Sequence, residues 1–284
     1  MQKTLVTGAN GFIGKHLMDR LGESASALTR EDVSLADEKS MIRLLSKVEM
    51  VIHLAWSSTP GVSDGWREDI ANARALFDAC EEAAVKRIVF LSSGGSIYGV
   101  PREVPIRESH PLNPVCDYGR AKQEAEVDIS ARSAVDWVIL RGANAFGPGQ
   151  LGDKGQGVIG AWMRRVRNGE PIQLFGDGSI IRDFLYVSDL VDALCLATEI
   201  HSGRLTLNIG SGRGYSMLEV LSAIQSVTGI FPKIERLPER DCDVPTNVLD
   251  CLRAKEELGW TASTNLKDGI EQSWKWWSQV ASNS

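Results

Sequence analysis

Short apolar segments alternate with longer amphipathic segments along the first half of the chain. The apolar segments are typical of buried strands, and the amphipathic segments 70–84 and 119–133 are typical of helices. The expected strands cover residues 4–7, 25–29, 50–54, 87–91 and 137–141. Strands that alternate with helices are joined by right-handed crossovers and pair in parallel. The pattern therefore predicts an α/β fold with a doubly wound parallel sheet of the Rossmann type.

The second half of the chain predicts a smaller α+β region. A glycine-rich loop begins at Gly147 and leads to a helical segment that Gly169 closes. Ser216 and Glu219 have the spacing of a capping box, which starts another helix. The last helix carries an apolar stripe of Leu266, Ile270, Trp274 and Trp277. Core packing explains this stripe better than a ligand platform does.

A glycine turn follows the first expected strand, in the segment K-T-L-V-T-G-A-N-G-F-I-G. A helical pattern begins at Ile13, so strand, turn and helix come in the order that a dinucleotide-binding fingerprint requires. Gly8 permits the tight turn, Gly11 lets the backbone approach a pyrophosphate, and Gly14 lets the helix pack closely. Phosphates would then face the free N–H groups at the positive end of the helix. The segment predicts a dinucleotide site.

Tyr118 and Lys122 lie four residues apart at the start of an expected helix, and so on one face of it. An ammonium beside a phenol favours the phenolate and lowers the tyrosine pKa from its usual value of about 10. Such a tyrosine can act as acid and base in hydride chemistry on an alcohol. The spacing alone is common, but after a dinucleotide turn and a parallel-sheet pattern it predicts a catalytic pair.

Composition and charge narrow the class of protein. The chain has 284 residues, enough for one large or two modest domains, and a net charge of −6, which argues against binding nucleic acid. We find neither an apolar stretch of about 20 residues nor a secretion signal. The five scattered cysteines form no C-x-x-C pair, and the histidines have no metal-like spacing. We therefore expect a cytoplasmic protein with reduced thiols, no membrane span and no metal site.

Further motifs extend over nearly the whole chain. They are TGANGFIG (7–14), HLA (53–55), SSGGSIYG (92–99), YGRAK (118–122), RGANAFGPG (141–149), GDGSIIRDFLYVSDL (176–190), LNIGSG (207–212) and the tail pattern DVPTNVLD…ELGW (243–260). In this combination the chain resembles the extended short-chain dehydrogenase/reductase family, in its nucleotide-sugar epimerase and reductase branch. Members of that branch bind a nicotinamide cofactor in a first domain and a nucleotide-sugar in a second.

The resemblance implies both domain boundaries and cofactor-binding residues. Residues 1–149 plus about 183–210 would form the dinucleotide-binding domain, and residues 150–182 plus 211–284 the nucleotide-sugar-binding domain. Tyr118 would be the catalytic base, and Lys122 its partner, which also holds the nicotinamide ribose. The other expected cofactor contacts are Gly8, Asn10, Gly11, Phe12, Ile13, Gly14, Arg30, Asp32, Val33, Leu54, Ala55 and Ser92.

The resemblance also implies residues that bind the substrate. Asn144 and Arg182 match family positions near the sugar nucleotide and its phosphates, and Arg240 matches a second phosphate-binding arginine. Guanidinium groups suit a diphosphate because they bind its oxygens in pairs. Arg182 next to Asp183 also fits a surface ion pair, and Arg240 lies in a charge-rich stretch where a phosphate role and a plain surface charge are about equally good interpretations.

The chain departs from the family pattern around residue 94. The catalytic Ser or Thr of the family stands five residues before Gly99, where this chain has Gly94. Either Ser93 or Ser96 polarises the sugar oxygen and contacts the substrate, or no side-chain hydroxyl does. Sugar-nucleotide dehydratases have Asp-Glu directly after the Ser or Thr, whereas this chain has Gly95 and Ser96. Dehydration is therefore disfavoured.

The choice between NAD and NADP depends on the segment after the second expected strand. An acidic residue there binds the ribose hydroxyls of NAD, and an arginine accepts the 2′-phosphate of NADP. Arg30 is near that position, but so are Glu31 and Asp32, and the pair Asp32-Val33 resembles the adenine-contacting pair of the family. Both cofactors stay open.

Three functions follow from the resemblance, and the first is preferred. It is a nucleotide-sugar 4-epimerase that keeps NAD bound and acts through a transient 4-keto intermediate, on a UDP-hexose. The alternatives are an NADPH-dependent 4-ketoreductase of a nucleotide-linked 6-deoxysugar and a non-catalytic NADP(H)-sensing protein. The resemblance also implies a homodimer through helices 70–84 and 119–133 as a four-helix bundle, although packing on the sheet equally explains their apolar faces.

Overall fold

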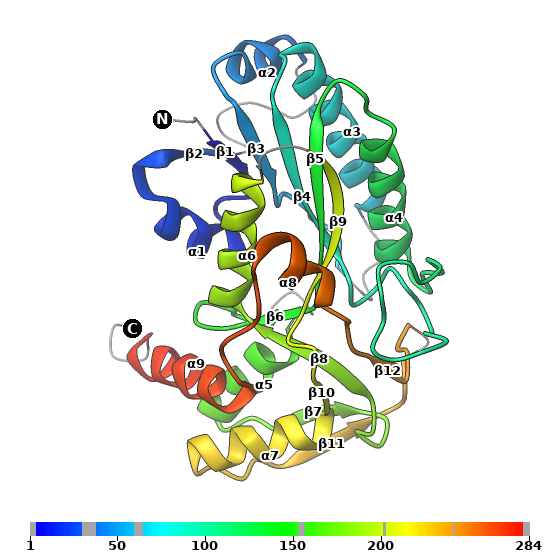
Figure 1. Cartoon of the computed structure of the whole chain (residues 1–284). Coiled ribbons are helices and arrows are strands. Elements are labelled where there is room, and N and C mark those ends of the chain that lie inside the picture. The colour runs from blue at the N-terminus through cyan, green and yellow to red at the C-terminus, as the bar shows by residue number, and fades with distance from the viewer. Residues whose placement is uncertain are drawn as a thin grey trace.

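A parallel sheet forms the larger part of the molecule (Figure 1). The computed structural model describes residues 4–29, 38–59, 65–152, 157–200, 203–240 and 242–280. In these residues the sheet has six strands in the order β2-β1-β3-β4-β5-β9. The strands are β1 Thr4–Thr7, β2 Ala25–Leu28, β3 Met50–His53, β4 Arg87–Ser93, β5 Asp136–Gly142 and β9 Arg204–Ile209. All their pairings are parallel, so the predicted Rossmann-type sheet is confirmed.

Helices cover both faces of this sheet (Figure 1). On one face lie α2 Glu38–Leu45, α3 Trp66–Glu82 and α4 Asp117–Ser130, and on the other α1 Phe12–Leu21 and α6 Val187–Glu199. Fully buried Phe77 of α3 and Leu17 of α1 belong to the two separate apolar cores that result. The expected helix at 70–84 instead begins at Trp66 and ends before Ala84, whose positive φ of 55° a helix cannot contain.

Two smaller sheets form the rest of the described structure. Strand β8 Ile181–Tyr186 pairs with β6 Asn144–Phe146, β10 Gly214–Ser216 and β12 Thr246–Asn247, and β7 Ile172–Phe175 pairs with β11 Ile234–Leu237. The accompanying helices are α5 Val158–Asn168, α7 Met217–Thr228, α8 Leu252–Leu258 and α9 Leu266–Val280, and a 3₁₀ turn, Gly22–Ser24, follows α1. The second sheet combines β6, which the predicted boundaries place in the first domain, with β10 and β12, which they place in the second. The domain boundaries stay a prediction.

The local signals in this region have the expected structural roles. Ser216 and Glu219 make both bonds of a capping box at α7, and Gly169 ends α5 with φ 68°. Ile270 and Trp277 of α9 are 0% and 4% exposed within the core between α5, α7 and α9. The aromatic stripe is therefore core, as expected.

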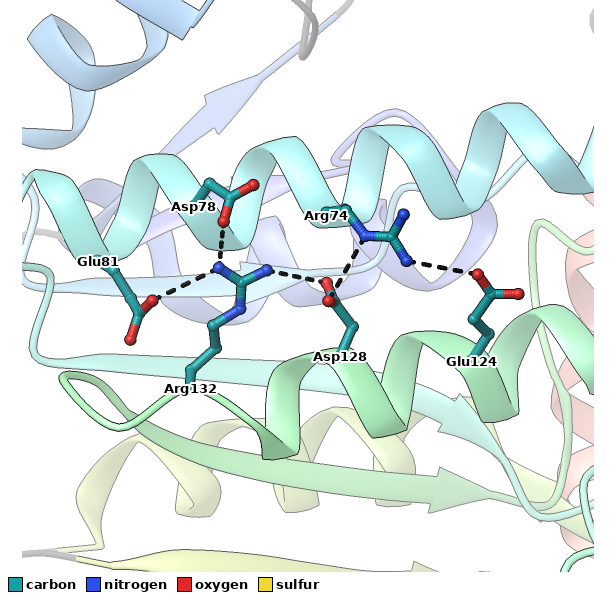
Figure 2. Close-up of polar contacts among 6 residues, drawn as sticks. All are labelled: Arg74, Asp78, Glu81, Glu124, Asp128 and Arg132. Carbon is teal, nitrogen blue, oxygen red and sulfur yellow. Dashed lines mark hydrogen bonds and ion pairs between the residues drawn. The ribbon is translucent and has the colours of Figure 1, made fainter.

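Charged residues connect the outer surfaces of α3 and α4 (Figure 2). The six residues are Arg74, Asp78, Glu81, Glu124, Asp128 and Arg132. Arg132, with 14% of its side chain exposed, contacts Asp78, Glu81 at 3.4 Å and Asp128 at 3.1 Å. Arg74 reaches Glu124 at 3.4 Å. Because α4 carries Tyr118, these ion pairs help to fix the helix on which the predicted catalytic residue lies.

Candidate active site

The glycine turn after β1 has the close backbone packing that the fingerprint predicts. A Cβ on Gly14 would lie 2.1 Å from the Gly8 carbonyl oxygen, and a Cβ on Gly8 would lie 2.7 Å from the Ala55 nitrogen. Gly8 also has a φ of 71°, which side chains disfavour. The turn is closed by a bond of 3.0 Å from the Gly11 N–H to the Gly8 carbonyl. Gly8 and Gly14 are therefore required by the backbone itself.

The start of α1 is open to an anion. Its N-cap, Gly11, makes no side-chain cap, and its first turn has no acidic residue. The N–H groups of Phe12, Ile13 and Gly14 are therefore left for a ligand. Asn10 is exposed at the mouth of this turn. A pyrophosphate fits this arrangement of donors, whose partial charge is positive.

The turn lies at the point where the order of the sheet reverses. Strands β2 and β3 lie on opposite sides of β1. The connection from β1 to β2 and the connection from β2 to β3 therefore run in opposite directions across the sheet. Ligands of open α/β sheets bind at the carboxyl ends of strands at such a point. Leu54 and Ala55, which follow β3, pack directly against Gly8. The expected contacts Arg30, Asp32 and Val33 lie outside the described residues.

Tyr118, Lys122 and Ser93 come together at the carboxyl end of β4. The Ser93 side chain lies beside the Tyr118 phenol and lowers its pKa. Lys122 Nζ donates to the Leu91 carbonyl at 2.9 Å and lies 5.9 Å from the centre of the Tyr118 ring. Neighbouring Ser92 is buried, and its hydroxyl has no hydrogen-bond partner among the described residues. Helix α4 thus brings a phenol and an ammonium to one edge of the sheet.

The sequence predicts a lowered pKa for Tyr118, and this prediction is wrong for the protein by itself. Burial raises the pKa of Tyr118 to about 12, with smaller contributions from Cys116 and Asp69, while the Ser93 hydrogen bond lowers it. Burial also lowers the pKa of Lys122 to about 7, against the opposing effect of Asp69 and Glu126. Loss of solvation is therefore the largest effect on the pKa of both groups. The resting site holds a neutral phenol beside a lysine that titrates near neutral pH.

The glycine at position 94 does not leave a gap beside Tyr118. A Cβ on Gly94 would lie 2.6 Å from a Leu249 methyl group and 2.9 Å from the Arg141 carbonyl oxygen. A side chain there would therefore meet these two groups. The preceding residue, Ser93, is the one whose side chain lies beside the Tyr118 phenol. The structure therefore favours Ser93 over Ser96 for the predicted hydroxyl, and the catalytic role of Ser93 stays a prediction.

Ser96 has a different surrounding. A Cβ on Gly119 would lie 2.5 Å from the Ser96 carbonyl oxygen, so the backbone at Ser96 packs against the first turn of α4.

For the predicted role of Ser93, polarising the sugar oxygen, we expect Ser93→Ala to lower kcat about 100-fold, because the variant lacks the donor to that oxygen. Ser96→Ala should stay within about threefold of the wild type. Steady-state rates of the two variants make the comparison, and a Ser93→Ala enzyme of normal activity would contradict the assignment.

Two predicted phosphate-binding arginines converge on one carboxylate. Arg182 Nη2 lies 3.2 Å from Asp243 Oδ1, and Arg240 contacts both oxygens of Asp243 at 2.8 and 2.9 Å. Asp183 is 0% exposed and instead accepts bonds from Ser211. The alternative of a surface ion pair between Arg182 and Asp183 is therefore wrong. Two guanidinium groups on one carboxylate leave a net positive charge, which suits a diphosphate.

Asn144 connects the second sheet to the turn after β4. Its Nδ2 donates to the Asp183 carbonyl at 2.8 Å, and its Oδ1 would lie 3.6 Å from a Cβ on Gly95. Asn247 donates to the Gly94 carbonyl at 3.0 Å from the other side. The predicted substrate residue Asn144 therefore lies near the Ser93 turn, while Arg182 and Arg240 lie together around Asp243.

Two residues that no sequence motif indicated belong to this site. Trp56 follows the HLA motif, and the centre of its ring lies 3.7 Å from Lys122 Nζ. Asp69 of α3 is 6% exposed and bonds the segment after Trp56. Their contacts involve residues 56–58, which follow β3 and have no periodic signal.

Fold and site together define a dinucleotide-dependent enzyme of the short-chain dehydrogenase/reductase type. A family model, "NAD dependent epimerase/dehydratase family", matches residues 4–210. The chain belongs to this family. The predicted family and fold class are thereby confirmed, and with them an NAD-dependent enzyme.

Relatives and solved structures resemble the chain over nearly its full length. It is 31% identical to UDP-glucose 4-epimerase of Azospirillum brasilense, over 99% of this chain and 93% of that protein. It is 30% identical to the enzyme of the same name from Bacillus subtilis, over 96% of both. The structure of Thermotoga maritima UDP-glucose 4-epimerase with UDP-glucose has a TM-score of 0.92 at 31% identity, covering 99% of this chain and 100% of that one. MoeE5 in complex with UDP-glucose and NAD has a TM-score of 0.88 at 33% identity, with the same coverage.

Proposed function

We propose that the protein is a UDP-hexose 4-epimerase that keeps NAD bound through its reaction cycle. The observation that carries this proposal is the cluster of Tyr118, Ser93 and Lys122 at the sheet edge that also holds the glycine turn. Relatives and solved neighbours that act on or bind UDP-glucose support the same substrate class.

Tyr118 is the proposed acid and base. Bound NAD would accept the hydride from sugar C4, and its positive charge would favour the Tyr118 phenolate. Tyr118 takes the proton of the 4-hydroxyl, and Ser93 donates a hydrogen bond to the same oxygen. On return of the hydride to the opposite face of the 4-keto sugar, Tyr118 would give the proton back. Proton and hydride are thus both restored, and the only net change is the configuration at C4.

Lys122 has a supporting role in this mechanism. Its ammonium holds the positive charge beside Tyr118 that favours the phenolate once the cofactor is in place. The Leu91 carbonyl and the Trp56 ring fix its Nζ. We infer that Lys122 also binds the ribose of the nicotinamide half, as the family resemblance implies.

Arg182 and Arg240 are proposed to bind the diphosphate of the substrate. We expect Arg182→Leu to raise KM about 10- to 100-fold and to leave kcat within about threefold, because it removes binding common to the ground and transition states. Initial rates over a range of UDP-glucose concentrations measure this. A fall in kcat at unchanged KM would instead show that Arg182 acts on the reacting centre.

The state of the cofactor distinguishes the proposal from its alternatives. The purified protein should release about one NAD per chain when denatured, and should interconvert UDP-glucose and UDP-galactose without added cofactor. A protein that is purified without dinucleotide, binds NADPH and leaves UDP-glucose unchanged would contradict the epimerase proposal. NADPH-dependent reduction of a 4-keto sugar nucleotide would indicate the ketoreductase, and NADPH binding without turnover would indicate the sensor.

We further propose a homodimer through α3 and α4. Val127 of α4 is 65% exposed, and Ala71 of α3 is also exposed. The charges nearby already pair within the chain (Figure 2), so a second copy can bury them without leaving a charge uncompensated. Val127→Arg should convert a dimer to a monomer in light scattering, whereas Val100→Arg, at a position 57% exposed, should not. A wild-type protein with the mass of a monomer would contradict this proposal.

No helix within the described part of the chain is long and apolar enough to cross a membrane. The cytoplasmic location stays a prediction.

A further inference from the structure

Asp69 organises the segment that follows β3. Its Oδ1 accepts hydrogen bonds from the Ser57 N–H at 2.8 Å and the Ser57 hydroxyl at 2.7 Å, and its Oδ2 accepts one from the Ser58 N–H at 2.8 Å. The carboxylate is buried at the start of α3. Three bonds from two successive residues leave this segment little freedom relative to the helix.

The same segment holds Lys122 in place. Trp56 Nε1 donates to the Ser58 hydroxyl at 2.9 Å, which fixes the indole. The indole face lies 3.7 Å from Lys122 Nζ, close enough for a cation–π interaction. From the other side, Lys122 donates to the Leu91 carbonyl. Asp69 therefore fixes Ser58, and Ser58 fixes the Trp56 indole. The indole in turn fixes the position of the Lys122 ammonium.

Asp69 also acts on Lys122 by its charge. It forms no ion pair with any cation in the described ranges, and its charge raises the pKa of Lys122 and of Tyr118. Glu126 also faces Lys122, but Arg141 neutralises it at 2.7 Å.

The remaining titratable neighbours contribute less. Burial lowers the pKa of His53, which faces Lys122 from β3, to about 3, so this imidazole is neutral. Burial raises the pKa of Cys116, which faces Tyr118 from the residue before α4, so this thiol is also neutral. Asp69 is therefore the carboxylate near Lys122 that lacks a cationic partner among the described residues.

We propose that Asp69 is a positioning residue of the reaction, which fixes the Lys122 ammonium through Ser57, Ser58 and Trp56 and stabilises its positive charge. The inference rests on the proposed function for the role of Lys122 and deepens it. Asp69 itself contacts neither Tyr118 nor Ser93 through any hydrogen bond within the described structure.

The test uses Asp69→Asn, which removes the charge at nearly constant shape. Titration of the Lys122 side chain by NMR, assigned with Lys122→Arg, should show a midpoint about one pH unit lower than in the wild type. Both limbs of the pH profile of kcat should also move to lower pH, because the lost negative charge lowers the pKa of Tyr118 and of Lys122 together. A merely structural residue would change stability and leave both titrations unmoved.

Two further variants serve as controls. Asp78→Asn makes the same substitution on the same helix, at an exposed residue bound to Arg132, and should leave the Lys122 titration unchanged. Asp69→Glu keeps the charge but displaces the carboxylate from Ser57 and Ser58, so kcat should fall about tenfold while the titration midpoint stays. If Asp69→Asn does not fold, an Asp69→Glu enzyme with wild-type kcat overturns the proposal.

The two proposals fail in different ways. An enzyme that epimerises UDP-glucose but whose Lys122 titration is the same in the wild type and in Asp69→Asn overturns the role of Asp69. If the wild type leaves UDP-glucose unchanged, the epimerase proposal is overturned. A Lys122 titration midpoint that still shifts in Asp69→Asn, and not in Asp78→Asn, would then support the effect of the Asp69 charge on Lys122.

Discussion

Replacement of Tyr118 by Phe should lower kcat about 1,000-fold or more, because the variant lacks the group that takes and returns the proton of the 4-hydroxyl. The ring itself remains, so the first turn of α4 keeps its packing. NAD binding should therefore stay within about threefold of the wild type. Steady-state rates and the amount of NAD released on denaturation measure the two quantities separately.

Tyr98→Phe provides a matched control for this prediction. Tyr98 is also a buried tyrosine, and burial also raises its pKa to about 12. Its hydroxyl donates to Asn208 at 2.6 Å and accepts from Arg141 at 2.9 Å. Its loss should lower the free energy of unfolding by about 1–3 kcal/mol and leave kcat nearly unchanged. If Tyr118→Phe retains normal turnover, Tyr118 is not the base.

Replacement of Gly14 by Ala should abolish stable NAD binding and lower the free energy of unfolding by more than about 3 kcal/mol. The new Cβ would lie 2.1 Å from the Gly8 carbonyl oxygen and 2.7 Å from Ala9 Cα. Both are backbone atoms of the turn, so the contact cannot be relieved by a side-chain rotation. The turn and α1 must separate, and the N–H groups that face the pyrophosphate lose their arrangement.

Gly22→Ala is the control for Gly14→Ala. Gly22 lies at the other end of α1 with a φ of 53°, and a Cβ there meets nothing within 4 Å. Only backbone strain of about 1–3 kcal/mol is expected, with NAD bound as in the wild type. Thermal unfolding and NAD content of the two variants provide the comparison. Full NAD content in Gly14→Ala would contradict the assigned role of the turn.

The sheet could be predicted where strands and helices alternate without interruption. β1 to β5 lie in such a run, and each expected strand is present. β9 pairs with β5, but α5, β7, β8 and α6 separate the two along the chain. Local periodicity does not show that the chain returns to the edge of this sheet after α6, so the pattern alone did not place the sixth strand. The same holds for the second sheet, whose short strands come from distant segments.

The placement of Tyr118 and Lys122 together could be predicted because four-residue spacing on a helix fixes which side chains share a face. The pKa direction of Tyr118 could not, because burial dominates it and spacing does not reveal burial. The choice between Ser93 and Ser96 likewise depends on the path of the turn. That path would place a Cβ at position 94 against Leu249 and the Arg141 carbonyl. Trp56 and Asp69 were missed because their contacts depend on a segment without periodic pattern.

The fate of the hydrogen at sugar C4 tests the central claim most directly. UDP-glucose that carries deuterium at C4 is incubated with the purified protein in ordinary water, without added cofactor. An epimerase with bound NAD transfers that deuterium to the cofactor and back, so UDP-galactose should form with deuterium at C4. Unchanged UDP-glucose, or UDP-galactose that has lost the deuterium at C4, would contradict the account.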